Sequence, residues 1–96
     1  MIVETFTFHL KPDADEAAFL DADARVQTDF YYAQRGCVRR TTARAADGEW
    51  LVVVLWSTSS EADAAAGAAR TDDATRAFGA FLDEGTIRTK RYTPLD

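Results

Sequence analysis

Apolar and polar side chains alternate along the first segment of the chain, IVETFTFHL (residues 2–10). Ile2, Phe6 and Phe8 fall on one face of this segment, and the threonines fall on the other. Alternation with period two, in aromatic and β-branched residues, predicts a β-strand with one buried face. The segment EWLVVVLWS (49–57) contains an unbroken apolar run instead, and it predicts a strand that is buried on both faces.

Two more polar segments have the β-branched content of strands. CVRRTTARA (37–45) carries little apolar weight and predicts a strand at the edge of a sheet, and TIRTKRYT (86–93) predicts a fourth strand. Asp47 and Gly48 lie between the segment 37–45 and the apolar run that follows it. An Asp-Gly pair between two strands predicts a tight hairpin.

A helical pattern follows the first strand. Asp13, with Glu16 three residues later, has the spacing of an N-terminal capping box, and Gly36 is typical of a helix C-terminus. Between them, apolar residues recur every three or four positions, which predicts one buried helical stripe. The stripe consists of Phe19, Ala22, Val26, Phe30 and Ala33.

Two further helical segments follow the apolar strand. Thr58 and Glu61 have capping-box spacing and begin an alanine-rich helix that runs to about Arg70. Residues 71–73 (TDD) begin a shorter helix, which is predicted to end near Glu84. Its inward-facing residues are Phe78, Phe81 and Leu82.

The order of elements is β-α-β-β-α-β, which predicts a single α+β domain over residues 1–96 with ferredoxin-like topology. In that topology the sheet has four antiparallel strands, the helices cover one face, and the first and third strands are central. The helices of one chain leave the second face of the apolar strand at 49–57 uncovered. Large exposed apolar patches are uncommon on monomers. We therefore expect a homodimer packed sheet to sheet, against the alternative of a solvent-facing apolar patch.

Composition narrows the choice of partners. The chain has 96 residues, a net charge of −5 and 28% charged residues. An acidic surface argues against binding to nucleic acid and to anionic membranes. No apolar stretch approaches the roughly 20 residues of a membrane span. Cys37 is the only cysteine, so no intrachain disulfide can form, and we expect a cytoplasmic protein without a signal peptide.

Three segments together carry a resemblance to a known family. They are TFTFHLKPDADEAAF near the start, the helical segment that ends at Gly36, and VVVLWSTSSEADA. In these segments the chain resembles the dimeric α/β-barrel superfamily, in particular the antibiotic biosynthesis monooxygenase-like domains and the related stress-responsive α/β-barrel proteins. The resemblance implies two ferredoxin-like domains paired into a barrel. Activities in the superfamily include cofactor-independent monooxygenation of polycyclic aromatic polyketides, haem degradation and lactone isomerisation.

The resemblance transfers one site residue, Trp56. The monooxygenase branches place an asparagine four residues before this tryptophan or on the first strand, where this chain has Val52 and Phe6. The haem-degrading branch places a histidine on the helix after the tryptophan, where this chain has Ala66. We therefore expect no haem, no metal and no other cofactor.

An apolar ligand pocket is expected between the helices and the sheet. Its predicted lining is Phe6, Phe8, Phe30, Tyr31, Trp56, Phe78 and Phe81. For Trp56 the competing interpretation is packing in the core. Two functions remain open: a cofactor-independent, monooxygenase-like enzyme acting on a small hydrophobic or aromatic molecule, and a non-catalytic binding or regulatory module. A polar group buried beside Trp56 favours the enzyme, and a pocket filled by side chains favours the module.

No residue is identified as catalytic. His9, the only histidine, falls on the polar face or at the end of the first strand, and Cys37 lies in a strand without a base nearby in sequence. No cluster of cysteine, histidine and carboxylate residues has metal-ligand spacing. Most basic residues lie near the two predicted edge strands, where they suit an anion site, protection of the sheet edges, or ion pairs with Glu4, Glu49 or the acids of a partner chain across the dimer. These residues are Arg35, Arg39, Arg40, Arg44, Arg88, Lys90 and Arg91.

Overall fold

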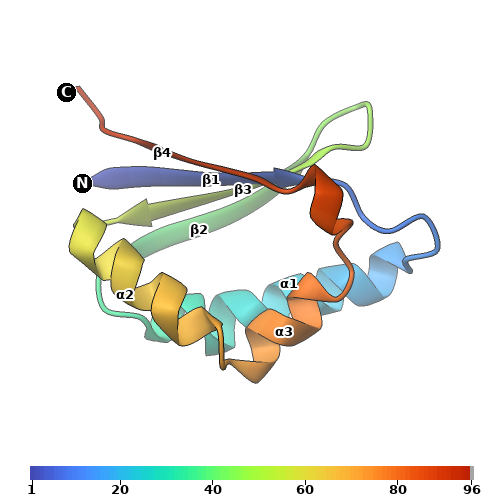
Figure 1. Cartoon of the computed structure of the whole chain (residues 1–96), viewed down its shortest axis with the longest axis horizontal. Coiled ribbons are helices and arrows are strands. Elements are labelled where there is room, and N and C mark those ends of the chain that lie inside the picture. The colour runs from blue at the N-terminus through green and yellow to red at the C-terminus, as the bar shows by residue number, and fades with distance from the viewer. Residues whose placement is uncertain (96) are drawn as a thin grey trace.

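A computed structural model describes residues 1–95, in which a four-stranded antiparallel sheet carries the helices on one face (Figure 1). The strands are β1 (Ile2–Phe8), β2 (Cys37–Arg44), β3 (Trp50–Trp56) and β4 (Arg88–Tyr92). Their order across the sheet is β2-β3-β1-β4, so the first and third strands are central, as predicted. The predicted ferredoxin-like α+β arrangement is confirmed.

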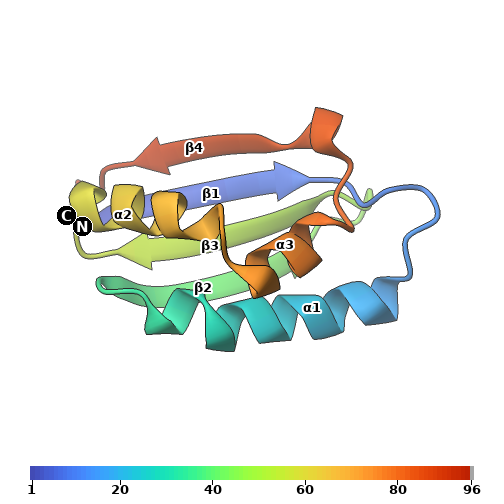
Figure 2. The same cartoon turned by 60° about the horizontal axis from the view of Figure 1, so that its bottom comes forward.

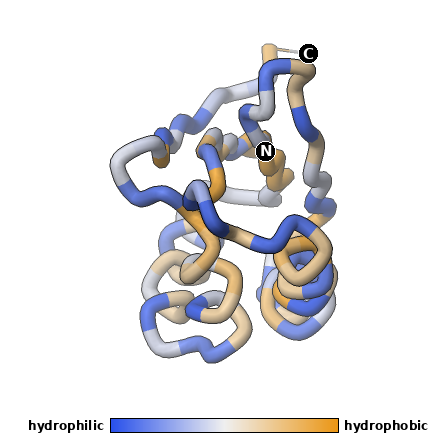
Figure 3. Tube along the Cα trace, turned by 90° about the vertical axis from the view of Figure 1, so that its right-hand side faces the viewer, coloured by the Kyte–Doolittle hydropathy of each residue, from blue (hydrophilic) through white to orange (hydrophobic). Residues whose placement is uncertain are grey.

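The helical layer contains α1 (Glu16–Asp29), α2 (Ser59–Ala69) and α3 (Asp73–Gly79). Short 3₁₀ turns lie at Tyr31–Ala33 and Glu84–Thr86. In Figure 2, α2 passes in front of the sheet while α1 runs along the side of β2. α3 packs against α1 and continues the layer that α2 begins. Seen end-on in Figure 3, the helical coils lie on one side of the strands, in separate groups at the lower left and lower right.

The core lies between the sheet and the helices. Glu4 pairs with Val54 and Phe6 pairs with Val52, and this register places the side chains of all four on the helix side of β1 and β3. A sheet buries one set of alternate side chains against the layer that covers it. The largest fully buried side chains are Trp56, Phe8, Phe19, Val26, Val52 and Val54.

The opposite face of the sheet has no helix over it within residues 1–95 (Figures 1 and 3). Leu51, Val53 and Leu55 of β3 alternate with the buried residues of that strand and are only partly buried. Val3 lies opposite Leu55 on the neighbouring strand and is also partly exposed. We call this surface the open face. That a second copy of the chain covers it stays a prediction.

The first helix begins later than predicted. Its N-cap is Asp15, whose side chain accepts a hydrogen bond from the backbone nitrogen of Ala17 at 2.9 Å. Asp13 lies in the preceding turn, which is closed by a hydrogen bond of 3.0 Å from the Ala14 nitrogen to the Lys11 carbonyl. The prediction chose the wrong aspartate because two of them precede the apolar stripe at similar spacing.

The same helix also ends earlier than predicted, at Asp29 and not at Gly36. The chain departs from regular α-helical dihedrals at Phe30, which has a φ of −113° and a ψ of −67°. The 3₁₀ turn at Tyr31–Ala33 leaves the rings of Phe30 and Tyr31 facing the core side, with their centroids 5.1 Å apart. Gly36 then turns the chain into β2 with a φ of 84°, a conformation that favours glycine.

The third helix is likewise shorter than predicted, ending at Gly79 and not near Glu84. Glu84–Thr86 forms a separate 3₁₀ turn, and β4 begins only at Arg88. The Thr86 hydroxyl accepts a hydrogen bond of 2.8 Å from the backbone nitrogen of His9 and so joins this turn to the end of β1.

Two local predictions are confirmed. The Thr58 side chain caps α2 by accepting a hydrogen bond of 3.2 Å from the Glu61 nitrogen, and its hydroxyl also contacts the Glu61 carboxylate at 3.0 Å. The hairpin between β2 and β3 turns at Gly48, which has a φ of 94°. Both features depend on neighbouring residues, and for that reason local patterns predict them well.

Candidate functional site

A cavity of ≈ 450 Å³ lies between the sheet and the helices, and its wall is largely apolar. Residues of β1 and β3 form its floor, the alanines of α2 form one side, and α3 and the 3₁₀ turn at Tyr31–Ala33 form others. All residues predicted for this pocket border the cavity except Phe81, which packs against Phe19. The aromatic residues of the wall are Phe6, Phe8, Phe30, Tyr31, Trp56 and Phe78.

Trp56 is both a buried residue and a wall of the cavity. Its residue exposure is 1%, and its indole Nε1–H donates a hydrogen bond of 3.0 Å to Oε1 of Glu4. Glu4 is itself only 6% exposed and borders the same cavity. Buried carboxylates need partners, because a charge without one is costly to remove from water. The indole N–H supplies one such partner and holds the Trp56 ring in place.

Arg91 supplies the second partner of Glu4. Its Nε donates to Oε2 of Glu4 at 3.0 Å, and its Nη1 donates to Oδ1 of Asp63 on α2 at 2.6 Å. The Arg91 side chain is 33% exposed, so this ion pair is partly open to water. Arg91 therefore connects β1, β4 and α2 at one end of the cavity, and Glu4 has hydrogen bonds to both carboxylate oxygens.

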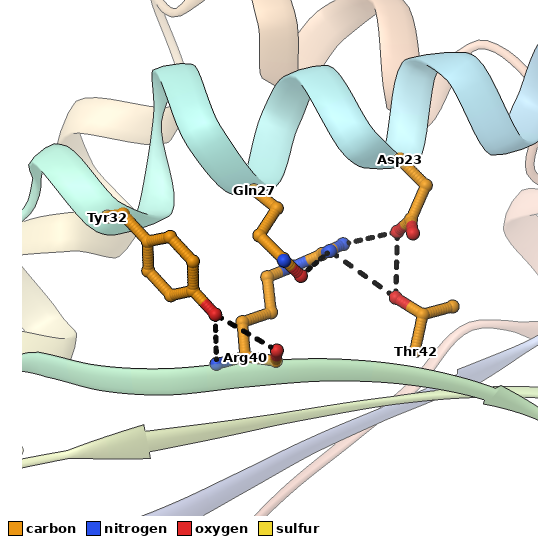
Figure 4. Close-up of polar contacts among 5 residues, drawn as sticks. All are labelled: Asp23, Gln27, Tyr32, Arg40 and Thr42. Atoms are coloured by element: carbon orange, nitrogen blue, oxygen red, sulfur yellow. Dashed lines mark hydrogen bonds and ion pairs between the residues drawn. The ribbon is translucent and has the colours of Figure 1, made fainter.

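A second polar group, centred on Arg40 of β2, lies under α1 (Figure 4). The Arg40 guanidinium forms a 2.9 Å ion pair with Asp23, and its Nη1 lies 3.4 Å from Gln27 Oε1 and 3.3 Å from Thr42 Oγ1. The Tyr32 hydroxyl contacts the backbone of Arg40, at 3.3 Å from both its nitrogen and its oxygen. These contacts hold an arginine that is only 3% exposed.

Arg40 also borders the cavity, where it meets aromatic rings. Its guanidinium carbon lies 4.9 Å from the ring centroid of Tyr31 and 5.4 Å from that of Phe78. The Nε–H is buried and has no hydrogen-bond partner within residues 1–95. An unsatisfied buried donor costs about 1–3 kcal/mol. Arg40 thus keeps an unused donor, itself buried, beside a wall that is otherwise mostly apolar.

A bulge in β2 decides that Arg40 faces the cavity. The pairing of β2 with β3 shifts between Cys37 and Arg39, so that Cys37 lies opposite Trp56 and Arg40 lies opposite Val54. Cys37 and Arg40 both face the helix side, although strict alternation over three residues would place them on opposite faces. The bulge therefore turns a charged residue of an edge strand inward.

Burial raises the pKa values of two groups beside Arg40. The pKa of Tyr31 is raised mainly by burial, with the charge of Arg40 acting in the opposite direction. The pKa of the Cys37 thiol is also raised by burial, again against a lowering by Arg40. Tyr31 therefore stays a neutral hydroxyl near neutral pH, able to donate or accept a hydrogen bond. Cys37 lacks the lowered pKa of a reactive thiolate.

The remaining candidates lie elsewhere. His9 is exposed beyond the end of β1 and does not border the cavity. No group of three or more histidine, cysteine or carboxylate residues is placed to hold a metal ion within the described part of the chain. None of the described helices is both long and apolar enough to cross a membrane.

Three of the seven basic residues near the edge strands form ion pairs within the described part of the chain. Arg91 pairs with Glu4, as the sequence suggested, and Arg44 pairs with Glu16 at 2.8 Å. Arg40 pairs with Asp23. Of these three ion pairs the sequence predicted only that of Arg91 with Glu4, whereas the acids that pair with Arg40 and Arg44 were not predicted. Sequence reasoning did not place Glu4 or Arg40 in the pocket, although the alternation of β1 contained a signal: Glu4 shares the face of Phe6 and Phe8.

No protein-family model and no curated protein sequence matches the chain. Solved structures do match it along nearly its whole length. A variant of SnoaB, a cofactor-independent oxygenase from Streptomyces nogalater, is 20% identical over 99% of this chain and 93% of its own, with a TM-score of 0.80. An antibiotic biosynthesis monooxygenase described as putative, from Bordetella bronchiseptica, is 18% identical over 98% and 96%, with a TM-score of 0.83.

A third similar structure, Rv0793 from Mycobacterium tuberculosis, is 23% identical over 99% of this chain and 95% of its own, with a TM-score of 0.72. Sequence identities at this level indicate a shared fold. The function must be argued from the residues of the site. The chain therefore has the fold of the antibiotic biosynthesis monooxygenase-like proteins.

Proposed function

We propose that this protein is a cofactor-independent, monooxygenase-like enzyme that acts on a small, flat hydrophobic or aromatic molecule held in the cavity. The observation that carries the proposal is a buried carboxylate, Glu4, hydrogen-bonded to Trp56 in the wall of an otherwise largely apolar cavity. Burying a charge has a cost that simple core packing does not require. The similarity in fold to a cofactor-independent oxygenase supports the same function.

The chemistry suits a substrate that can itself reduce oxygen. In an anthrone, the ring CH₂ lies between two aromatic rings and is activated by a carbonyl. Its oxidation by O₂ yields the quinone and water: one oxygen atom becomes the new carbonyl, and the other leaves as water with both hydrogens. The carbon loses four electrons, and the O₂ molecule accepts them. The protein would exclude water and orient the rings against Trp56 and the phenylalanines of the wall.

Oxygen uptake tests this proposal directly. We would use 1,8-dihydroxy-9-anthrone as the probe and measure O₂ consumption and quinone formation against heat-denatured protein. The wild type should accelerate both in equal amounts. Trp56→Phe should lower the rate because the indole donor to Glu4 is lost, whereas Trp50→Phe should leave it unchanged because Trp50 does not border the cavity. Equal rates with native and denatured protein would overturn the proposal.

One observation favours a second function, a non-catalytic binding or regulatory module with the same pocket. Both oxygens of Glu4 already accept hydrogen bonds, and His9 lies outside the cavity, so neither is placed as a free general base. Tight binding of the anthrone without acceleration of its oxidation would support this second function.

We also propose that the protein is a cytoplasmic homodimer whose open faces pack together. The apolar side chains of Leu51, Val53 and Leu55 on a face without helices support this assembly. Val53→Asp should yield monomer or insoluble protein, because an unpaired buried charge is costly. Leu20→Asp, at an exposed position of α1, is the matched control and should stay dimeric. Sedimentation equilibrium at micromolar concentration decides the question, and a wild-type species of 10.6 kDa would overturn it.

A further inference from the structure

The two polar ends of the cavity differ in how completely their hydrogen-bonding groups are used. At the first end, Glu4 accepts from both Trp56 and Arg91, and Arg91 also donates to Asp63. At the second end, Arg40 uses its two terminal nitrogens and leaves Nε–H without a partner among the described residues. The hydrogen-bonding group that stays unused beside the cavity is therefore a donor, the Arg40 Nε–H.

Tyr31 adds a hydroxyl next to this donor. Its ring contacts the Arg40 guanidinium, lies 6.2 Å from the Trp56 ring between centroids, and borders the same cavity. The charges that act on Tyr31 come from Arg40 and Glu4, and the Cys37 thiol lies on the same side. Arg40 is balanced by Asp23, so this end of the cavity has little excess charge. A neutral acceptor atom fits it better than a full anion.

We propose that Tyr31 and Arg40 form a specificity site for an oxygen acceptor on the ring system of the ligand, such as an aryl ketone. The carbonyl oxygen would accept hydrogen bonds from the Tyr31 hydroxyl and the Arg40 Nε–H, while the rings lie against the aromatic wall. This arrangement fixes which edge of a flat ligand points toward β2. The inference rests on the proposed function only in taking the cavity as the ligand site, and it does not depend on any oxidation.

A matched pair of ligands separates the acceptor from the apolar contacts. 9-Fluorenone and fluorene have the same flat ring system and differ in a carbonyl group against a CH₂ group. Hydrogen bonds to charged groups contribute about 1.5–3 kcal/mol, so fluorenone should bind about ten- to a hundredfold more tightly than fluorene. Quenching of tryptophan fluorescence and calorimetry measure both affinities. The carbonyl stretch of bound fluorenone should also move to lower wavenumber than in an apolar solvent.

Variants assign the acceptor site to its residues. Tyr31→Phe and Arg40→Met should each reduce the preference for fluorenone and the shift of its carbonyl band, with little change in fluorene affinity. Tyr92→Phe is the control for a lost hydroxyl, because Tyr92 pairs with Val3 and does not border the cavity. Arg44→Met is the control for a lost arginine on the same strand, because Arg44 pairs with Glu16 near the surface.

The outcomes are distinct from those of the oxidation assay. A preference for fluorenone that Tyr31→Phe abolishes supports the acceptor site even if no anthrone is oxidised. If Arg40→Met does not fold, the result with Tyr31→Phe alone tests the acceptor site. Equal affinities for the two ligands, or a preference that survives in Tyr31→Phe and Arg40→Met, would overturn the inference. Failure of both ligands to bind would overturn the cavity as the ligand site, and with it this inference.

Discussion

Arg40 and Arg91 lie on the two edge strands of the sheet and border the same cavity, yet the protein holds them differently. The Arg40 side chain is 1% exposed and keeps one donor without a partner, whereas the Arg91 side chain is 33% exposed and joins two carboxylates. Arg91 therefore fastens β4 and α2 to the buried Glu4. Arg40 is a buried charge with one N–H donor that has no partner among the described residues.

The difference shows that a basic residue on an edge strand can have several roles. Exposed cations discourage pairing between sheet edges. A cation whose side chain points into the core must form ion pairs or hydrogen bonds there, because the loss of its hydration otherwise destabilises the fold. Arg40 finds most of its partners on α1 and in Thr42, and it finds aromatic rings on the cavity side. The role of an arginine on an edge strand thus depends on where its side chain points. It can protect the sheet edge, connect two elements through ion pairs, or contribute a hydrogen-bond donor to a site.

The largest expected effect concerns Arg40, the more deeply buried of the two arginines. Arg40→Met leaves Asp23 without its ion-pair partner, and breaking a buried pair in this way costs about 3–5 kcal/mol. Arg44→Met is the control and should change the unfolding free energy by about 1 kcal/mol or less, because both members of its pair are about half exposed. Urea titration at fixed protein concentration measures both. Equal losses in the two variants would contradict the distinction.

The next effect concerns Trp56, which the Arg91 end of the cavity holds through Glu4. Emptying a packed aromatic site costs about 3–5 kcal/mol, and Phe8→Ala should lose that amount. Trp56→Ala enlarges a cavity that already exists and should fall at or below the low end of that range. The same urea titration compares them. A Trp56→Ala protein as unstable as Phe8→Ala, with no quenching by aromatic ligands in the wild type, would assign Trp56 to the core alone.

A smaller loss is expected at the partly exposed arginine. Arg91→Met removes one of the two hydrogen bonds to Glu4 and the contact with Asp63. Because water can reach this end, the unfolding free energy should fall by about 1–2 kcal/mol. Asp63→Asn removes only the outer half of the bridge and should cost less. If Arg91→Met costs as much as Arg40→Met, exposure does not explain the difference between the two arginines.

The smallest effect is a pH dependence on the Arg40 side of the cavity. Burial raises the pKa of Tyr31 in the folded protein, whereas an unfolded tyrosine ionises near its ordinary pKa of about 10. The stabilising contribution is therefore complete below pH 10 and is lost as the pH rises above about 10. Tyr31→Phe should show a shallower decline in unfolding free energy than the wild type in that range. A parallel decline in the wild type and Tyr31→Phe would contradict the prediction.

Local patterns in the sequence determined the order of strands and helices, the Asp47–Gly48 hairpin and the Thr58 cap. Each of these depends on neighbours within a few residues, where alternation and capping act directly. The aromatic wall of the cavity was also largely predictable, because Phe6, Phe8 and Trp56 fall on the buried faces of central strands.

Only the tertiary structure decided that Arg40 and Tyr31 meet at the cavity. The bulge after Cys37 turns Arg40 inward, and the 3₁₀ turn at Tyr31–Ala33 brings Tyr31 beside it. Glu4 is tolerated in the core because Trp56 and Arg91, far away in sequence, supply its hydrogen bonds. A buried charge is stable only with such partners, and partners so distant along the chain leave no periodic signal in the sequence.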